Sequence, residues 1–285
     1  MKPSIAINGE NFVLVKIQRD NESAIYKGAD TFLRLGEKGR IIQELAIHKR
    51  MEELSFPVAR LLKEGEYEGQ LYFIETSLGA EHYGELFARD VKKYGRISDE
   101  RFEDFLAIMK RFARAQVSTC GEQRDEDRFA DSIHMPMLLD EFPDLAPRIQ
   151  KYYIEAMKKL ALFPFCLTHG DCNPHNIHTG GIIDLEVASS GPIGYDLISA
   201  LVTVDYFPSV PGYEFITGYQ FTDKQKQRYL EVIDSVFAEA GLPPVSQYTH
   251  EFEFCRAVWL LVRMHKWPKL RQFRYDIFMK KFLNA

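Results

Sequence analysis

Side chains that carry oxygen ligands are concentrated in one short stretch of this sequence. Asp171 and Asn176 follow the apolar run 160–167, and Asp184 comes thirteen residues after Asp171. The Gly-Gly pair at 180–181 predicts the turn of a β-hairpin, with Asp184 on the returning strand. A tight hairpin can bring these three side chains to one end of a cleft. Two carboxylates and an amide oxygen are hard ligands, which suit Mg²⁺ better than zinc.

A set of this kind contains the groups that phosphoryl transfer requires. Mg²⁺ typically binds one or two protein carboxylates and completes its coordination with phosphate oxygens and water. The set therefore supplies one base-like Asp for a substrate hydroxyl, and an Asn and an Asp for the metal. Two other interpretations stay open, a polar loop closed by Asx-turns and a zinc site that uses His169, His175 and His178.

The first eighty residues are rich in β-forming side chains and predict a small antiparallel sheet with one helix against it. Apolar alternation and turn residues predict strands at 11–17, 23–29, 31–36, 58–65 and 70–76, and helical spacing predicts a helix at 37–54. The rest of the chain is mostly helical in pattern, and the tail from residue 250 onward also predicts a helix. Its clearest segments are 98–116, with Ser98 as N-cap, and 222–241, with a Thr222/Gln225 capping box.

The change in pattern predicts two domains in an α+β fold, with domain 1 at residues 1–79, domain 2 at residues 80–285, and the connection at about 74–80. The chain has 36 Lys and Arg against 41 Asp and Glu, a balance that argues against nucleic acid and membrane surfaces as partners. Four scattered cysteines, no signal peptide and no long apolar segment predict a cytoplasmic protein.

The order His169-Gly170-Asp171, then Asn176, Asp184 and a downstream "GYDLISA" closely resembles the aminoglycoside phosphotransferase and choline kinase family of small-molecule kinases. The resemblance covers nearly the whole chain in element order, and its specific motifs lie within residues 168–200. It implies a two-lobed protein kinase-like fold with a nucleotide-binding first lobe. It also implies ATP or GTP as the phosphate donor and Mg²⁺ as the cofactor.

The resemblance implies a role for each matching position of the second lobe. Asp171 corresponds to the catalytic base, and Asn176 and Asp184 correspond to the Mg²⁺ ligands. The supporting positions are His169, which shapes the catalytic loop, Asp196, which caps its own helix and braces that loop, and Glu186, near the metal or substrate.

In the first lobe the family uses a lysine on the third strand and a glutamate on the following helix to hold the α- and β-phosphates. Here Arg34 stands in place of the lysine, and Glu44 is the matching acid. Because Arg and Lys differ in shape and hydrogen bonding, this departure bears on the phosphate geometry. The first hairpin, at 18–23, also has no GxGxxG loop. The segment "YFIETSLG" resembles the hinge, where the carbonyl of Glu75 and the N–H of Ser77 would bind adenine.

The predicted function is transfer of the γ-phosphoryl group of Mg·ATP to a hydroxyl of a small molecule. Compatible acceptors include aminoglycosides, amino alcohols such as choline, and sugars. The acceptor is expected between the catalytic loop, residues 205–219 and the C-terminal helices. A non-catalytic nucleotide-binding module stays open because of Arg34 and the absent glycine loop. A protein kinase also stays open, although the HRD arginine and an APE sequence are missing.

Overall fold

The computed structural model describes residues 2–18, 23–262 and 266–284. The chain forms two compact units, a first unit of Met1–Glu81 with His178–Glu186 and a second unit of His82–Ile177 with Val187–Ala285. The turn of the first predicted hairpin, whose loop carries no glycine motif, lies outside the described residues, as do three residues of the predicted C-terminal helix.

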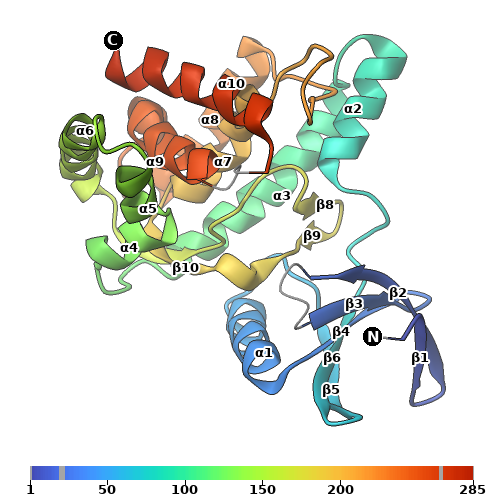
Figure 1. Ribbon diagram of the computed structural model, residues 1–285. Coiled ribbons are helices and arrows are strands. Elements are labelled where there is room, and N and C mark those ends of the chain that lie inside the picture. The colour runs from blue at the N-terminus through green and yellow to red at the C-terminus, as the bar shows by residue number, and fades with distance from the viewer. Residues whose placement is uncertain (1, 19–22, 263–265, 285) are drawn as a thin grey trace. The chain divides into compact units, whose positions relative to one another are not determined.

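The first unit contains one antiparallel sheet in the order β1-β2-β3-β4-β6-β5 (Figure 1). Its strands are β1 Ser4–Ile7, β2 Glu10–Ile17, β3 Ser23–Lys27, β4 Thr31–Gly36, β5 Leu61–Tyr67 and β6 Gln70–Thr76. The sequence predicted all of these except β1. That strand is only four residues long and lies at the edge of the sheet, so its alternation is too short to stand out.

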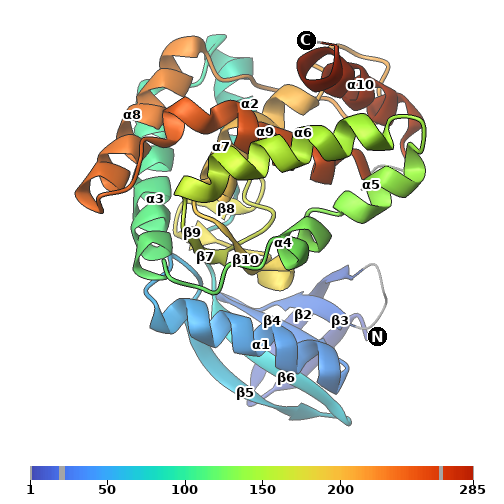
Figure 2. The ribbon, with the colours of Figure 1, turned by 90° about the vertical axis from the view of Figure 1, so that its left-hand side faces the viewer.

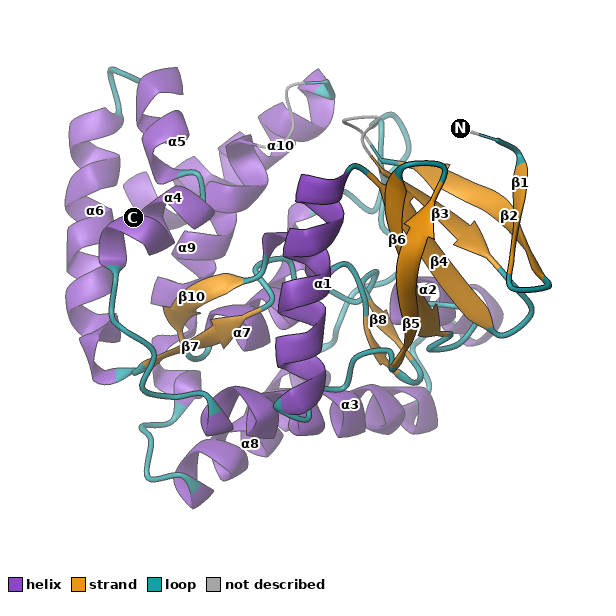
Figure 3. Cartoon of the chain, turned by 90° about the horizontal axis from the view of Figure 1, so that it is seen from below, coloured by secondary structure: helices purple, strands orange, loops and turns teal. Residues whose placement is uncertain are grey.

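Alternation along the strands directs successive side chains to opposite faces of this sheet. Leu33 and Leu35 of β4 lie in an apolar core cluster with Ile74 of β6. Arg34 lies opposite Phe73, and both point to the other face. Helix α1, Lys38–Glu53, packs on β4, β5 and β6 on the face that carries Arg34 and Phe73 (Figure 3).

The second unit is mostly helical. Its helices are α2 Tyr83–Tyr94, α3 Asp99–Ser118, α4 Glu126–Ser132, α5 Met135–Glu141, α6 Ala146–Lys159, α7 Tyr195–Val202, α8 Asp223–Glu239, α9 Thr249–Val262 and α10 Pro268–Phe278. The predicted Ser98 cap and the Thr222/Gln225 capping box are both formed. In the described ranges, no helix combines the length and the apolar character that crossing a membrane needs.

Helix α9 is the centre of the second unit. It contacts α5, α6, α7 and α10, and Figure 2 shows α6 running across it. Eleven of its fourteen residues are buried, including the charged Arg256. A helix that is buried on all sides is normally apolar throughout, so a charge within it calls for a specific partner.

Two short strand pairs complete the structure. In the second unit β7, Phe165–Thr168, pairs with β10, Ser189–Pro192. The predicted hairpin is formed by β8 Ile177–His178 and β9 Gly181–Ile182, but its turn is at 179–180, one residue earlier than predicted. Gly181 instead allows the backbone of Pro57 to lie close to it, because a Cβ at this position would lie 2.0 Å from the Pro57 carbonyl oxygen. The strand β9 also ends before Asp184, which was predicted to lie on it.

Candidate active site

The first unit contains a buried ion pair between β4 and α1. Strand alternation turns Arg34 toward α1, and Glu44 lies on the buried side of that helix. Nη1 of Arg34 lies 3.6 Å from Oε2 of Glu44, and the two side chains are only 11% and 8% exposed. The structure therefore brings these two predicted residues together.

Glu75 on β6 supplies a second carboxylate to Arg34. Its Oε1 lies 3.4 Å from Nε of Arg34, and its Oε2 lies 3.3 Å from Nδ1 of His48 on α1. Burial alone would lower the pKa of Arg34, but the charges of Glu75 and Glu44 outweigh burial and raise it. The sequence predicted a role only for the backbone of Glu75, so its side-chain contacts are an addition.

Arg40 extends these ion pairs to Glu186. Nε of Arg40 donates to Oε1 of Glu44 over 2.8 Å, and Nη2 of Arg40 donates to Oε2 of Glu186. Burial, and then the charge of Asp184, raises the pKa of Glu186 above its usual range. Arg34, Glu44, Arg40 and Glu186 thus form a chain of alternating charge.

A small cavity of about 20 Å³ lies in this cluster, which is room for one water-sized group. It is lined by side chains that include Arg34, Glu44, His48, Glu75, Asp184 and Glu186. Asp184 has a φ of 68°, in the left-handed region that Asp and Asn enter more readily than most residues. The cavity thus joins Asp184 to the residues predicted to bind the nucleotide.

The donor set of Asp184 and Asn176 fits Mg²⁺. Among the described residues, no three His, Cys, Asp or Glu side chains form a group that could hold a metal by themselves. A cation that uses these two types of ligand would need further oxygen ligands, and Mg²⁺ commonly takes them from substrate phosphates and water. Asn176 belongs to the second unit and Asp184 to the first.

The predicted adenine contact at Ser77 meets a competing bond. The N–H of Ser77 donates to the carbonyl of Asp30 over 2.9 Å, and its Oγ accepts from the N–H of Gly79. Because one N–H makes one strong bond, adenine could use Ser77 only if the bond to Asp30 broke. In this structure that N–H extends the β4–β6 ladder.

In the second unit, β7 leads directly into the His169-Gly170-Asp171 loop. Gly170 has a φ of 81°, and a Cβ on it would lie 2.5 Å from the carbonyl oxygen of Val187. Only glycine fits this position, which explains the residue between His169 and Asp171. Nδ1 of the buried His169 accepts the N–H of Asp171 over 3.2 Å, so this side chain shapes the loop.

Asp196 braces the same loop from α7. Its carboxylate accepts hydrogen bonds from the N–H of His169 at 2.6 Å, the N–H of Gly170 at 3.0 Å and Nε2 of Gln116 at 2.7 Å. The side chain is fully buried, and burial raises its pKa despite these donors. The expectation that Asp196 also caps its helix was wrong, because the N-cap of α7 is Gly194.

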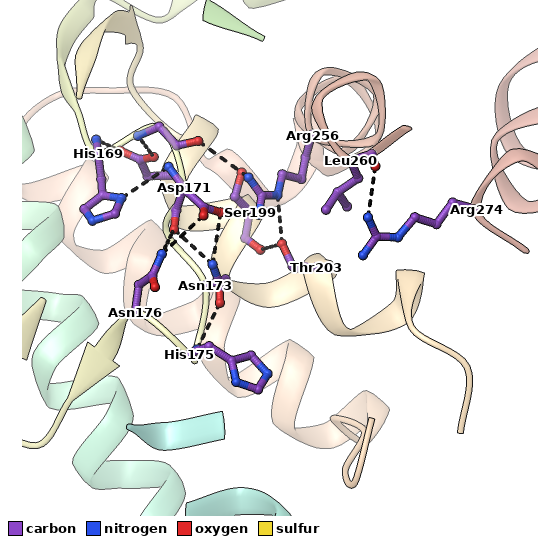
Figure 4. A network of polar contacts seen from close by, with 12 residues as sticks. His169, Asp171, Asn173, His175, Asn176, Ser199, Thr203, Arg256, Leu260 and Arg274 are labelled. Carbon is purple, nitrogen blue, oxygen red and sulfur yellow. Dashed lines mark hydrogen bonds and ion pairs between the residues drawn. The ribbon is translucent and has the colours of Figure 1, made fainter. Parts of the chain in front are cut away.

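The carboxylate of Asp171 is held by three side chains (Figure 4). Oδ1 accepts from Nη2 of Arg256 at 2.7 Å and from Nδ2 of Asn173 at 3.0 Å. Oδ2 accepts from Nδ2 of Asn176 at 3.3 Å. The predicted base and one predicted metal ligand are therefore neighbours in the structure.

A larger cavity of about 220 Å³ lies beside this loop. Pro174 and His175 line it from the loop, Thr203 and Phe207 from the segment after α7, and Tyr219 from the end of the 205–219 stretch. Burial, and then the charge of His82, lowers the pKa of His175. The cavity is mostly apolar, with Glu85 as the acidic residue in its lining.

Sequence reasoning missed Arg256, Asn173 and Gln116 in the second unit, and Arg40 and His48 in the first. For Arg256 a signal existed, because it is a single charge within the apolar run "CRAVWLLV". Asn173 is two residues from Asp171 and resembled an ordinary loop residue. The others lie on helices where a polar side chain gives no indication of its direction.

Comparison with known proteins identifies relatives of the chain. The model of a phosphotransferase enzyme family matches residues 16–231, which is more than half of the sequence. No curated protein sequence matches this chain significantly.

Two solved structures show the same fold. An aminoglycoside phosphotransferase from Streptomyces rimosus, in complex with ADP and streptomycin, has a TM-score of 0.54 at 13% identity, over 87% of this chain and 92% of the other. A choline/ethanolamine kinase family protein from Mesorhizobium loti has a TM-score of 0.54 at 12% identity, over 94% of this chain and 86% of the other. The predicted α+β kinase-like fold is confirmed.

Proposed function

Because this chain belongs to the phosphotransferase enzyme family, we propose that it transfers the γ-phosphoryl group of a nucleoside triphosphate to a hydroxyl of a small molecule. ATP or GTP is the donor, and Mg²⁺ accompanies it. The acceptor hydroxyl gives its proton to Asp171, and the acceptor oxygen bonds to the γ-phosphorus. The bond from that phosphorus to the β–γ bridging oxygen breaks, and the nucleoside diphosphate leaves.

The observation that carries this proposal is the fixed carboxylate of Asp171. Three side-chain donors hold it, and the loop beneath it is braced by Asp196. A polar loop closed only by Asx-turns does not need a buried arginine from a distant helix. Phosphoryl transfer depends mainly on positioning and charge, and a base fixed in one orientation supports that chemistry.

In this proposal the remaining predicted residues bind the nucleotide and its metal ion. Arg34, fixed by Glu44, binds the phosphates, and the end of β6 at Glu75 lies near adenine. Asp184 and Asn176 are the Mg²⁺ ligands, and Nδ2 of Asn176 faces Asp171, which turns its Oδ1 away. When bound, Mg²⁺ neutralises charge on the phosphates.

The cavity of about 220 Å³ beside Pro174 and His175 is the proposed acceptor site. It lies next to the loop of Asp171, where the sequence predicted the acceptor. Its volume is below the range of about 300–1,000 Å³ that is usual for ligand pockets, which favours a small acceptor. Its aromatic lining, with Phe207 and Tyr219, favours stacking or apolar contact.

The test is Mg²⁺-dependent release of ADP with a panel of small hydroxyl compounds. We expect Asp171→Asn and Asp184→Ala each to lower kcat by about 10²–10⁴-fold, because they remove the base and a metal ligand. Circular dichroism and the melting temperature should show that both variants remain folded. Near-normal turnover in either folded variant contradicts its assigned role. A wild-type protein that binds Mg·ATP but phosphorylates nothing in the panel favours the non-catalytic module.

A further inference from the structure

Arg256 makes a direct contact with the proposed base from a helix distant in sequence. It lies in the middle of α9 with its side chain 1% exposed, and its Nη2 donates to Oδ1 of Asp171 over 2.7 Å. Its Nε donates to Oγ1 of Thr203 over 2.9 Å, and its guanidinium lies 4.1 Å from the ring centroid of Trp259. Every part of this side chain is therefore fixed by packing or hydrogen bonds.

A second buried arginine shows that this contact is not the only way to bury a guanidinium here. Arg274 on α10 is also fully buried, yet it donates to the carbonyl oxygens of Tyr206 and Leu260. The structure shows no carboxylate partner for it within the described ranges. Burial, and then the charge of Arg256, lowers the pKa of Arg274 to about 9. Two carbonyl groups thus satisfy Nε and Nη1 of this buried arginine, while its Nη2 has no hydrogen-bond partner among the described residues.

The two oxygens of Asp171 differ in how many donors they accept. Oδ1 accepts from Arg256 and Asn173, and a carboxylate oxygen has about two acceptor sites. Oδ2 accepts only the longer bond from Asn176, at 3.3 Å, among the described residues. One acceptor site on Oδ2 therefore remains for another donor.

We infer that Arg256 is a positioning residue that holds Oδ1 of Asp171 and so leaves Oδ2 as the oxygen that meets the acceptor hydroxyl. The inference rests on the proposed phosphoryl transfer. In the reaction the hydroxyl proton moves to Oδ2, the acceptor oxygen bonds to the γ-phosphorus, and the nucleoside diphosphate departs with the bridging oxygen. Arg256 keeps its own protons throughout, because a guanidinium does not act as an acid at neutral pH.

Arg256 also connects the base to the acceptor cavity. Thr203 lines that cavity, and its hydroxyl accepts from Nε of Arg256 while it donates to the carbonyl of Ser199. The hydroxyl of Thr203 is therefore fixed in direction, and the guanidinium is fixed by it. The cavity wall and the carboxylate are held by one side chain, so the distance between a bound acceptor and Oδ2 is set by the protein before binding.

The experiment compares Arg256→Met and Arg256→Lys with Arg274→Met in the full-length protein. The acceptor is the compound with the highest rate in the wild-type panel. We expect Arg256→Met to lower kcat by about 100-fold or more while the KM for ATP stays within about threefold, because positioning acts on the transition state. The kcat of Arg256→Lys should lie between those of the wild type and Arg256→Met, because lysine keeps the charge but has no planar pair of donors. Arg274→Met should lower the melting temperature and leave kcat within about threefold of wild type.

Chemical rescue separates positioning from a merely structural effect. Arg256→Ala leaves space in the buried site, and we expect guanidinium chloride below denaturing concentration to raise its kcat at least about tenfold. Asp171→Ala should show no such increase. If Arg256→Met does not fold, Arg256→Lys and the rescue of Arg256→Ala carry the test.

Three outcomes overturn the inference. The first is a kcat of Arg256→Met within about threefold of wild type. The second is a loss of kcat that follows the loss in melting temperature equally in Arg256→Met and Arg274→Met, with no rescue by guanidinium. A wild-type protein that transfers phosphate to no acceptor removes the proposed function and the inference with it. The first two outcomes require an active wild-type enzyme, so the failures are distinguishable.

Discussion

The two units each contain a polar centre, and the residues in the middle of these centres, Arg34 and Asp171, are opposite in charge. In the first unit a cation, Arg34, is held by the carboxylates of Glu44 and Glu75. In the second unit an anion, Asp171, is held by Arg256 and the amides of its own loop. The first centre therefore presents a positive group surrounded by acceptors, and the second a negative group surrounded by donors.

This difference matches what each centre has to do in the proposed reaction. A nucleotide phosphate that binds Arg34 must compete with two carboxylates, which keeps the binding reversible. A hydroxyl that approaches Asp171 meets an oxygen whose other contacts are already made. The first centre would thus limit how strongly Arg34 binds phosphate. The second would orient one carboxylate oxygen of Asp171 toward the acceptor hydroxyl.

The largest effect is expected when Arg34, the cation of the first centre, is removed. Arg34→Met leaves Glu44 and Glu75 buried without their main countercharge, so we expect the free energy of unfolding to fall by about 3–5 kcal/mol. Arg34→Lys keeps the charge and should cost only about 1 kcal/mol, because lysine cannot reproduce the hydrogen bond of Nε to Glu75 and the contact of Nη1 with Glu44 together. Urea denaturation measures both. Equal losses in the two variants would show that shape, and not charge, holds this centre.

A smaller effect is expected from the brace beneath the second centre. Asp196→Asn places an amide N–H₂ among three N–H donors, so at least one donor loses its acceptor. We expect the free energy of unfolding to fall by about 1–3 kcal/mol at neutral pH. Unfolding by urea with circular dichroism measures it, and unchanged stability would show that the brace contributes little.

The same residue predicts a pH dependence. Burial raises the pKa of Asp196 in the folded protein, so the folded state binds a proton more readily than the unfolded state. Its contribution to the free energy of unfolding should therefore fall as pH rises from about 4 through the raised pKa. Subtracting the pH profile of Asp196→Asn from that of the wild type isolates this contribution. A difference that rises over the same pH range contradicts the sign.

The smallest effect is expected from Glu75, one of the two carboxylates that contact Arg34. Glu75→Gln keeps an oxygen for Arg34 but removes a negative charge from the cluster. We expect the free energy of unfolding to fall by about 1 kcal/mol and the Kd for Mg·ATP to fall about two- to fivefold. Calorimetric titration measures the affinity, with Lys38→Gln, at an exposed surface pair, as control. Weaker ATP binding would show that Glu75 supports the site instead of competing with phosphate.

Local sequence was sufficient for most of the fold. Strands β2 to β6 and helix α1 were predictable because apolar alternation and helical spacing act over a few residues. The buried stripe of α3, which includes Phe105 and Met109, was predictable for the same reason. The motif from His169 to Asp184 indicated a phosphotransferase family, and the family match over residues 16–231 confirms that membership.

The contacts within the two centres were not predictable, because they join residues far apart in the chain. Arg256 is 85 positions from Asp171, and Glu75 is 41 positions from Arg34. Such contacts depend on the direction of a side chain on a packed element, and spacing within one element does not contain that information. The misplaced turn at Gly180–Gly181 has a similar cause. Gly181 is required by the approaching carbonyl of Pro57, and not by the turn itself.

The first unit is built from two segments far apart in the chain, which affects how it folds during synthesis. Its continuous part ends at Glu81, but His178–Glu186 belong to it as well. The N–H of Gly180 bonds to the carbonyl of Leu78, and the N–H of Ile182 bonds to that of Pro57. On the ribosome the sheet therefore emerges about a hundred residues before its last partner, at several residues per second. In the nascent first unit the carbonyls of Leu78 and Pro57 therefore lack these partners until much of the second unit has been synthesised.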